Sequence, residues 1–383
     1  MTPKQKLKCK VAAWWIASSL VSGAVLSAGA VLSLTNDPAA FFHFLLDYQL
    51  VKEKYFRPVS DAALFEGASA GMVAALEDPY SALLTGKNYD ALMEATSGEY
   101  GGIGVVVGMD SENHFRVLYV FPDSAAEKAG LAAGDELLSI DGKSVSSMTI
   151  DEAAGAIRGE AGTAVKLLLS RNGKEELLSV TRANVTMPTV RGTMAEGHIG
   201  YIRIFSFTKH TPEEFRKEYE TLRQQGMEKM IIDLRMNPGG MIDSVVAVAD
   251  QILTGGTIVS FHTKGGQDES YDVKGVETPL PMAVLIDRNS ASASEILAGA
   301  VQDKKEGTII GETSFGKGTV QTILETNKGT ALKLSVAEYR TAAGRIIDKK
   351  GITPDIAVPQ TGTPFMPGND PVYEKALSVL EGK

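Results

Sequence analysis

The chain has 383 residues, of which 44% are hydrophobic and 22% charged, so a wholly disordered protein is excluded and two or three folded domains are expected. Its 38 Lys and Arg residues against 47 Asp and Glu residues give a net charge of −9, and no long basic block follows the N-terminus, so nucleic acid is not expected as a main partner. A single cysteine, Cys9, and five scattered histidines without HExxH spacing argue against a disulfide, a cysteine-built metal site and a zinc enzyme.

The first 36 residues are expected to act as a signal or transmembrane anchor. Four lysines within the first ten residues precede an uncharged stretch, residues 11–36, that is long enough to span a bilayer as a helix. Lysines before such a stretch predict an N-terminus held inside and a body that is exported. A cleaved signal peptide is the alternative, with Ala28-Gly29-Ala30 as the small-residue cleavage pattern. Both interpretations predict that the body lies outside the cytoplasm.

Residues 37–95 are expected to be mainly helical. Aromatic and aliphatic residues recur at spacings of three and four between Phe41 and Tyr55, which is typical of a helix with one apolar face. A second helical stretch, residues 61–76, ends before Asp78-Pro79 because proline does not continue a helix. We interpret this region as a dimerising helical arm that also contributes to the core.

Residues 96–183 alternate short strands with two short helices. The helices are expected to begin at the capping boxes Ser124-x-x-Glu127 and Thr149-x-x-Glu152. Asn172-Gly173 lies between two β-rich runs and predicts a hairpin with a type I′ turn. The pattern indicates a partly open β-barrel with two helices. The expected strands are residues 103–107, 115–121, 136–140, 165–171 and 175–180.

Residues 184–362 alternate strands with helices and are followed by a final helix in the segment 363–383. Expected strands at 200–207, 230–234 and 281–286 each precede a helix, and Thr211-x-x-Glu214 is expected to cap the first of these helices. This order predicts a layered βαβα domain whose functional site lies at the carboxyl ends of the strands. Most of the remainder, residues 307–358, is expected to be strand.

Three serines lie where one of these strands turns into a helix, within residues 288–295. A hydroxyl at a helix start lies among unpaired backbone N–H groups and the positive end of the helix dipole, which stabilise a developing oxyanion. Ser292-x-x-Glu295 is also a capping box, and capping alone would explain the serine. The pattern does not choose among Ser290, Ser292 and Ser294 as the nucleophile.

A serine nucleophile needs a base, and no histidine follows these serines in the chain. The remaining candidate is the lysine in Gly316-Lys317-Gly318. A lysine serves as a base only when its amine is neutral, which requires desolvation or a neighbouring positive charge. Glycines on both sides would allow close packing that buries the amine. An exposed lysine in a turn is the competing interpretation.

The segment 100–145 resembles a PDZ domain. The resemblance rests on Tyr100-Gly101-Gly102-Ile103-Gly104 and, more specifically, on the run from Phe121 to Val145. In PDZ domains a glycine-rich loop directs backbone N–H groups at the terminal carboxylate of a peptide, which adds as a strand to the sheet edge. The resemblance therefore implies that Gly101, Gly102, Ile103 and Gly104 bind a carboxylate. A tight turn is the alternative interpretation of these glycines.

Nearly the whole chain after residue 36 resembles the carboxy-terminal processing proteases, serine peptidases with a Ser/Lys catalytic pair and an inserted PDZ domain. Besides the PDZ segment, the motifs that carry the resemblance occur in the family's order. They are Asp78-Pro79-Tyr80-Ser81, Asp233-Leu234-Arg235-Met236-Asn237-Pro238-Gly239-Gly240, the serine run, Gly316-Lys317-Gly318-Thr319-Val320-Gln321 and Gly351-Ile352-Thr353-Pro354-Asp355.

The resemblance implies a role for each matching residue. Ser292 would be the nucleophile, Lys317 the general base and Gln321 the residue that orients the lysine. The oxyanion hole would consist of the backbone N–H of Ala293 and of Gly239, with Gly240 as the alternative to Gly239. Arg158, at the end of the second helix of the PDZ segment, would be a candidate link through which the PDZ domain gates the protease.

The resemblance also implies a fold and partners. We expect an N-terminal helical arm, a PDZ domain over residues 96–183 and an α/β protease core like those of crotonases and Clp proteases over residues 184–362. Substrates would be proteins or peptides with accessible C-termini, the terminal helices would form a homodimer, and no metal or cofactor is required. Two alternatives remain, a PDZ adaptor with a silent protease domain and a crotonase-like acyl-CoA enzyme.

Overall fold

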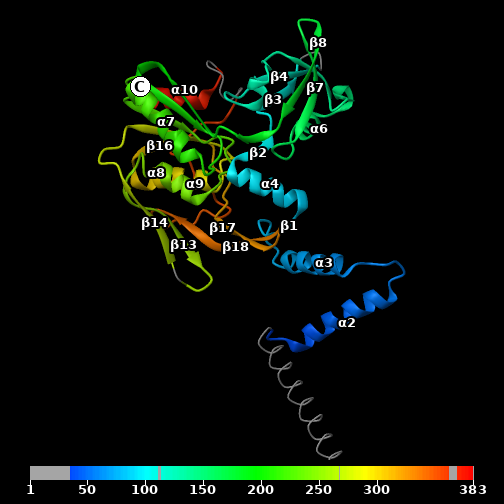
Figure 1. Cartoon of the computed structure of the whole chain (residues 1–383). Coiled ribbons are helices and arrows are strands. Elements are labelled where there is room, and N and C mark those ends of the chain that lie inside the picture. Colours follow the sequence, from blue (N-terminus) through cyan, green and yellow to red (C-terminus); the bar gives the residue numbers. More distant parts are fainter. Residues whose placement is uncertain (1–34, 111–113, 267, 362–368, 383) are drawn as a thin grey trace, which may run out of the picture. The chain divides into compact units, whose positions relative to one another are not determined.

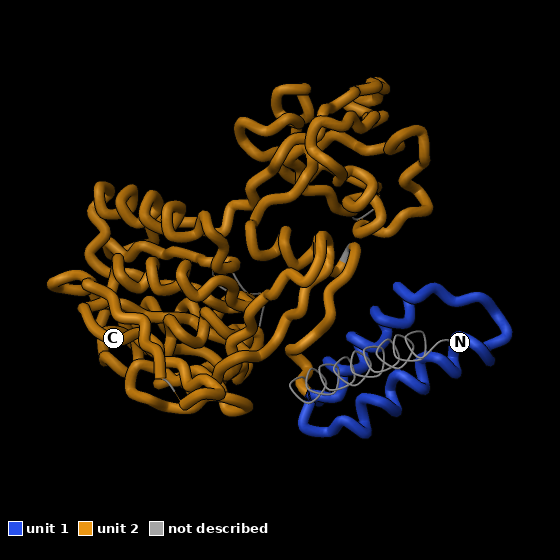
Figure 2. The backbone as a smooth tube through the Cα atoms, turned by 60° about the horizontal axis from the view of Figure 1, so that its bottom comes forward, with its two compact units in different colours: residues 1–77 blue, residues 78–383 orange. Residues whose placement is uncertain are grey.

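The computed structural model describes residues 35–110, 114–266, 268–361 and 369–382. The chain divides into two compact units, residues 1–77 and residues 78–383 (Figure 2). The predicted anchor or signal segment, residues 1–36, lies almost entirely outside the described residues. Within the described residues, no helix combines the length and the apolar content needed to cross a membrane.

The first unit contains the two predicted helices, α2 (Pro38–Lys54) and α3 (Asp61–Ala74). The side chains of Asp37 and Ser60 cap them by accepting backbone N–H groups of their first turns. The ring of Tyr48 stacks on that of Phe65 at 5.1 Å between centroids. The apolar residues whose spacing predicted one apolar face along α2 are largely exposed, including Phe42, Phe44, Leu45 and Val51, and Leu46 and Leu50 on the same helix are exposed as well.

The second unit contains a central six-stranded sheet (Figure 1). Its strands are parallel except for the first, which pairs antiparallel with its neighbour. This arrangement matches the predicted βαβα layering and brings the carboxyl ends of three central strands to one edge. In spatial order the strands are β10 (Val190–Met194), β11 (Ile199–Ile204), β12 (Lys229–Asp233), β15 (Met282–Ile286), β16 (Gly307–Gly311) and β19 (Ile356–Ala357).

Helices cover both faces of this sheet. The apolar side chains of β12 pack against helices on both faces of the sheet, because successive side chains of a strand point to opposite faces. Met230 and Ile232 pack in the cluster with α7 (Thr211–Gln224), α8 (Ile242–Ala249) and α9 (Ala293–Lys304), whereas Ile231 packs in the cluster with α10 (Pro371–Glu381). Full burial of each such side chain stabilises the fold by about 1.5–3 kcal/mol.

The helix expected from Thr211-x-x-Glu214 forms, but the predicted capping box is wrong. The N-cap residue is His210, and Thr211 is the first helical residue. The Thr211 hydroxyl donates to the carbonyl of Ser206, and the Glu214 carboxylate accepts the backbone N–H of Thr189 at 2.6 Å. Both side chains therefore hold neighbouring segments instead of capping their own helix.

A second, antiparallel sheet flanks the first and carries the segment that contains Lys317. Only its C-terminal strands were predicted, since residues 307–358 were expected to be mostly strand. Helix α4 (Gly86–Ser97) follows its first strand. The strands are β1 (Ala82–Thr85), β13 (Thr254–Thr263), β14 (Asp268–Gly275), β17 (Thr319–Asn327) and β18 (Thr330–Thr341).

The PDZ segment has its own sheet and its own buried cluster. Thr149 and Glu152 form the predicted capping box of helix α6 (Ile150–Ile157). Asn172 and Gly173 have φ of 52° and 75°, as the predicted type I′ turn requires. The other elements are β3 (Val105–Met109), β4 (Phe115–Val120), α5 (Ala125–Lys128), β5 (Glu136–Ile140), β6 (Lys143–Ser144), β7 (Ala164–Arg171) and β8 (Lys174–Thr181).

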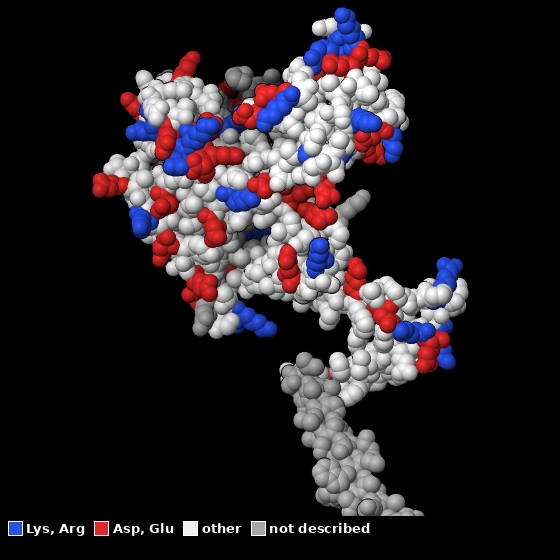
Figure 3. All heavy atoms as spheres, in the orientation of Figure 1, with Lys and Arg blue, Asp and Glu red and all other residues white. Residues whose placement is uncertain are grey.

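Two short strands connect the PDZ segment to the rest of the second unit. Strand β2 (Glu99–Gly102) enters the segment and strand β9 (Ala183–Thr186) leaves it, and the two pair antiparallel. On the face of residues 78–383 drawn in Figure 3, acidic and basic side chains are interspersed.

Candidate active site

A cavity of about 940 Å³ lies within the second unit and brings predicted site residues together. It is lined by strands of the antiparallel sheet, by the loops that follow β11 and β12, by α4, by the start of α9 and by the connection to the PDZ segment. Its volume is in the range of ordinary ligand sites, and many of its lining side chains are apolar. Of the predicted site residues, its lining includes Arg158, Gly239, Gly240, Ser292, Lys317 and Gln321.

The three candidate serines have different surroundings. Ser290 and Ser294 are fully buried, and their hydroxyls donate to the carbonyls of Leu234 and Asn237 at 2.8 and 3.0 Å. These bonds connect the start of α9 to the loop that follows β12. Ser292 is half-buried and lines the cavity. Among the three serines, Ser292 is therefore the one whose position allows contact with a substrate.

Ser292 has an unusual backbone conformation, with φ of 55° and ψ of −116°. L-residues seldom adopt such angles, and residues held in them cluster at functional sites. The conformation occurs where β15 ends and α9 begins, as the N-cap residue of the helix. The fully buried Ser290 and Ser294 on either side hold the turn in this shape.

The Glu295 carboxylate joins the segment of Ser292 to the segment of Lys317. It is fully buried and accepts five hydrogen bonds, from the N–H groups of Ser292 (2.8 Å), Lys317 (3.0 Å) and Gly316 (2.7 Å) and from the hydroxyls of Ser314 (2.6 Å) and Tyr339 (3.5 Å). Burial raises the pKa of this carboxyl group, and the hydrogen bonds from Ser314, Gly316, Ser292 and Lys317 oppose the rise. Sequence reasoning treated Glu295 only as half of a capping box and missed this bridging position.

The amine of Lys317 is partly desolvated. Burial lowers its pKa, the positive charge of Lys333 lowers it further, and the carboxylates of Glu295 and Asp78 act in the opposite direction. The expected close packing at the flanking glycines is present, because a Cβ at Gly318 would lie 2.6 Å from the side chain of Asp348. Nothing in the local sequence indicated Lys333, which lies on β18.

The motif Asp78-Pro79-Tyr80-Ser81 brings an aromatic ring to this amine. The Nζ of Lys317 lies 5.2 Å from the ring centroid of Tyr80. The Asp78 carboxylate accepts the Tyr80 N–H and the Ser81 hydroxyl, and the Ser81 oxygen accepts the N–H of Ser335 on β18. The motif thus fixes the ring beside the lysine. The sequence contained this motif, but no role could be read for Tyr80.

The side chain of Gln321 lines the same cavity but bonds elsewhere. Its amide nitrogen donates to the carbonyl and hydroxyl of Thr319 and to the hydroxyl of Ser335. Among the hydrogen bonds of the described residues, none joins Gln321 to Lys317. The predicted orienting contact is thus not made in this conformation.

The loop after β12 brings Gly239 close to the start of α9. A Cβ at Gly239 would lie 2.8 Å from the nitrogen of Ala293, so only glycine allows this approach. The Gly239 N–H donates to the side-chain oxygen of Asn237 at 2.8 Å. Gly240 lies opposite Phe207 in an isolated parallel bridge. The hydrogen bonds of this bridge run from the Phe207 N–H to the Gly239 carbonyl and from the Met241 N–H to the Phe207 carbonyl, so the Gly240 N–H is unpaired within the described part of the chain.

The four residues predicted to bind a carboxylate lie in two different elements. Gly101 and Gly102 belong to β2, and a Cβ at Gly101 would lie 2.0 Å from the carbonyl oxygen of Gly159, so close backbone packing explains that glycine. Ile103 and Gly104 lead into β3, which is an edge strand of the PDZ sheet and contacts α6. An edge strand beside a helix is the arrangement that peptide addition requires.

Arg158 lies where the PDZ segment meets α4. It is the C-cap residue of α6, and its guanidinium carbon is 4.6 Å from the ring centroid of Tyr100. Its Nη1 is 3.5 Å from the Glu94 carboxylate on α4. Both contacts border the cavity that contains Ser292 and Lys317.

Within the described residues, no group of three His, Cys, Asp or Glu side chains could hold a metal ion. A hydroxyl and a partly desolvated amine share one cavity, with backbone N–H groups beside them. These are the components of nucleophilic catalysis at a carbonyl group.

Comparison with known proteins gives matches along the chain. Residues 198–358 match peptidase family S41, residues 116–171 a PDZ domain, and residues 20–87 the N-terminal domain of the activating protease CtpB. The carboxy-terminal-processing protease of Bartonella bacilliformis is 38% identical over 322 residues, covering 82% of this chain and 74% of that protein. The carboxy-terminal processing protease CtpA of Bacillus subtilis is 37% identical over 314 residues, covering 81% and 67%. The solved structure of a photosystem II D1 C-terminal processing protease is 31% identical, covers 82% of this chain and 86% of that chain, and has a TM-score of 0.50.

Proposed function

Because this chain belongs to peptidase family S41, as a carboxy-terminal processing protease with a PDZ domain, we propose that Ser292 and Lys317 carry its peptidase reaction. The observation that carries the proposal is the shared cavity, which Ser292 and Lys317 both line while Ser290 and Ser294 are buried. The lowering of the Lys317 pKa by burial supports its role as the general base.

In the proposed reaction, neutral Lys317 accepts the hydroxyl proton of Ser292 as the serine oxygen attacks the scissile carbonyl carbon. The tetrahedral intermediate collapses, the C–N bond breaks, and the protonated lysine gives its proton to the leaving amine. Water then attacks the acyl-enzyme, again with Lys317 as the base, and Ser292 is regenerated. Gln321 orients the lysine once its amide turns from Thr319 toward the amine.

The oxyanion hole of this reaction is formed by the backbone N–H of Ala293 together with a glycine N–H of the loop after β12. Gly240 is the better donor, because the N–H of Gly239 already bonds to Asn237. Preorganised donors of this kind are strong contributors to catalysis, and loss of one typically raises the barrier by about 2.7–4 kcal/mol.

The PDZ domain binds the C-terminus of the substrate between β3 and α6, with the N–H groups of residues 101–104 near the terminal carboxylate. Arg158 then couples peptide binding in this groove to the protease active site through its contacts with Tyr100 and Glu94.

The body of the protein acts outside the cytoplasm, on the side opposite the N-terminal lysines, and residues 11–36 hold it at the membrane. Support comes from the charge pattern of the sequence. A protease-protection assay tests this location. If the body lies outside the cytoplasm, protease added to cells with an intact cytoplasmic membrane should digest it. Digestion only after that membrane is permeabilised would contradict the proposal.

Hydrolysis of casein and of a peptide with a free C-terminus by purified protein, compared with Ser292→Ala, tests the catalytic proposal. We expect the variant to lose activity and to retain its fold by circular dichroism. Ser290→Ala and Ser294→Ala are the controls, and should retain more activity than Ser292→Ala. Equal hydrolysis by the wild type and Ser292→Ala would remove Ser292 from the mechanism, and no hydrolysis by either would favour a PDZ adaptor.

A further inference from the structure

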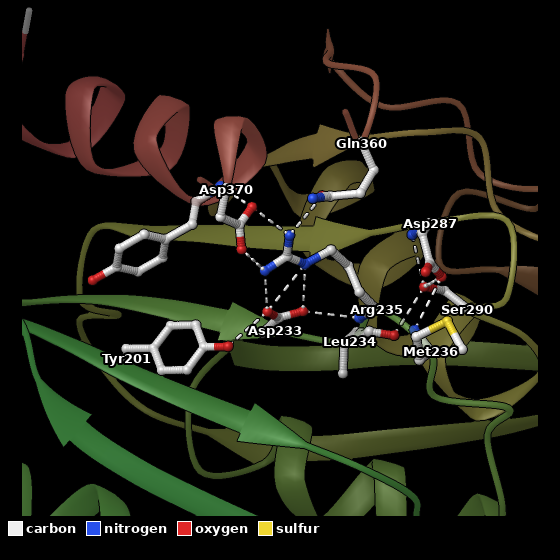
Figure 4. A network of polar contacts seen from close by, with 10 residues as sticks. Tyr201, Asp233, Leu234, Arg235, Met236, Asp287, Ser290, Gln360 and Asp370 are labelled. Carbon is white, nitrogen blue, oxygen red and sulfur yellow. Dashed lines mark hydrogen bonds and ion pairs between the residues drawn. The ribbon is translucent and has the colours of Figure 1, made fainter. Parts of the chain in front are cut away.

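A buried arginine lies directly before the loop that carries Gly239 and Gly240. Arg235 is almost fully buried, and its guanidinium donates to two carboxylates, those of Asp233 and Asp370, and to the side-chain oxygen of Gln360 (Figure 4). The bonds to Asp370 are bidentate, at 2.7 and 2.8 Å. Bidentate bonds between arginine and a carboxylate hold both groups in one relative orientation.

Asp370 belongs to the C-terminal helix and also shapes the start of that helix. It is the N-cap residue of α10, and its carboxylate accepts the N–H of Tyr373 at 3.1 Å. Helix α10 packs on the face of the central sheet opposite to α7, α8 and α9. A carboxylate from the last helix of the chain thus reaches the end of β12, 135 residues earlier in the sequence.

Other contacts hold the opposite side of this short segment. The carbonyl of Leu234 accepts the hydroxyl of Ser290, and the Met236 N–H donates to the Asp287 carboxylate at 3.0 Å (Figure 4). Residues 234–236 are therefore held on one side by the turn that precedes Ser292 and on the other side by α10. The glycine loop begins at the next residue, Asn237.

We infer that Asp370 is a positioning residue for catalysis, which acts through Arg235 to hold the glycine loop where its N–H groups face the reacting carbonyl. The inference rests on the proposed function, in which this loop donates to the oxyanion. Donors of an oxyanion hole act only at the correct distance from the oxygen, and a displacement of about 1 Å can lower the rate about 100-fold.

The inference predicts a specific kinetic signature. Neither Arg235 nor Asp370 lines the cavity, so neither contacts a bound substrate there. Loss of their contact should displace the oxyanion donors and leave ground-state binding intact. A residue that acts in this way lowers kcat and leaves KM unchanged.

Asp370→Asn is the test variant, because asparagine keeps the N-cap function but removes the charge and one of the two acceptors for Arg235. We expect kcat to fall roughly 10- to 100-fold with KM unchanged within about twofold. A peptide aldehyde, which adds reversibly to the serine hydroxyl and places an oxyanion in the hole, should bind more weakly by a similar factor.

Lys229→Met is the matched control. The amine of Lys229 donates to the carbonyl of Leu380 at 2.6 Å, so this variant loosens the other end of α10 without touching Arg235. We expect a lower Tm, with kcat and aldehyde binding unchanged. If both variants lower kcat equally, α10 acts only through general stability and the inference is wrong.

An Asp370→Asn variant with wild-type kcat and aldehyde affinity would also overturn the inference. If that variant does not fold, Gln360→Met decides, because it removes one acceptor of Arg235 and no charge. A fall in kcat at constant KM would support the positioning role, and unchanged kinetics would contradict it. Failure of the proposed function would be recognised separately, by activity that persists in Ser292→Ala.

Discussion

At the scale of single residues, the proposed chemistry depends on a lysine whose surroundings disfavour its charge. Burial and the nearby Lys333 lower the pKa of Lys317, although Glu295 and Asp78 favour the charged form. The Tyr80 ring lies beside the amine, with its centroid 5.2 Å from Nζ. Burying this amine therefore costs stability, and in return it supplies a base that can be neutral nearer to neutral pH.

The lowered pKa of Lys317 predicts the direction of two pH dependences. kcat/KM should rise with pH as the amine loses its proton, with a midpoint below the usual value of 10.5. The unfolded chain binds more protons than the native state between the lowered pKa and 10.5, so the Lys317 contribution to the free energy of unfolding should increase with pH in that window. A pH–rate profile and urea unfolding at several pH values measure both.

Substitutions at Lys317 separate its role as the general base from the stability cost of burying its amine. Lys317→Arg should abolish turnover, because arginine cannot be deprotonated in proteins. Lys317→Met should also abolish turnover but raise the Tm at neutral pH, because it removes a partly buried charge. Lys328→Met, at an exposed position, is the control and should change neither. Turnover by either Lys317 variant would mean that the base is another group.

Glu295→Gln tests the bridge between the nucleophile and the base. The substituted side chain presents an NH₂ group where the carboxylate accepts N–H or hydroxyl donors, so one side of the bridge loses its acceptor. We expect a loss of about 1–3 kcal/mol in the free energy of unfolding and a reduced kcat. Glu306→Gln is the control, since Glu306 accepts the N–H of Thr254 away from the cavity. A Glu295→Gln variant with the control's kcat would exclude a positioning role.

At the scale of elements, the antiparallel sheet, loops that follow strands of the central sheet and the connection to the PDZ domain meet around the cavity. Strand β15 and helix α9 provide Ser292, the segment entering β17 provides Lys317, and the end of α6 provides Arg158. Strands β2 and β9 carry the chain into and out of the PDZ domain. A displacement of α6 would thus change contacts with α4 on the wall of the cavity.

Arg158→Ala tests communication between these elements. If Arg158 links the PDZ groove to the protease, the variant should cleave peptides several-fold more slowly, and the rate should depend less on a free C-terminal carboxylate. Lys166→Ala, at an exposed position of the PDZ domain, is the control. Peptidase assays with free and amidated C-termini measure the effect. Unchanged rate and unchanged carboxylate dependence would end the gating hypothesis.

At the scale of the whole molecule, the predicted fold class is confirmed: an α/β S41 peptidase core with a PDZ domain and an N-terminal helical region. Of the two terminal helical regions expected to form a dimer, α10 uses its apolar face to cover the central sheet. The exposed apolar face of α2 is the better candidate for contact with a second copy.

Leu46→Glu combined with Leu50→Glu tests dimer formation, since these residues lie one helical turn apart on α2 and are 51% and 43% exposed. If α2 forms the dimer, exposing both side chains costs about 3–6 kcal/mol, so the dimer should weaken by more than about 100-fold. Gln49→Glu is the charge-matched control. Sedimentation of the purified proteins measures dimer dissociation. An unchanged oligomeric state would place any interface elsewhere.

The sequence by itself determined the elements whose signals are local. The capping box at Thr149 and the turn at Asn172-Gly173 involve residues at most three positions apart, and both are confirmed. The order of motifs likewise identified the family. Thr211 and Glu214 had the same local pattern as a capping box, yet tertiary partners at Ser206 and Thr189 took their side chains.

Only the tertiary structure could distinguish the serines, because their burial depends on the loop after β12, which lies more than fifty residues away. The same reason applies to the lowered pKa of Lys317, the Glu295 bridge and the bond from Arg235 to Asp370. Each depends on groups that folding brings together from distant segments. Spacing along a chain reports neighbours on one helix or strand, whereas desolvation and charge pairing depend on neighbours in space.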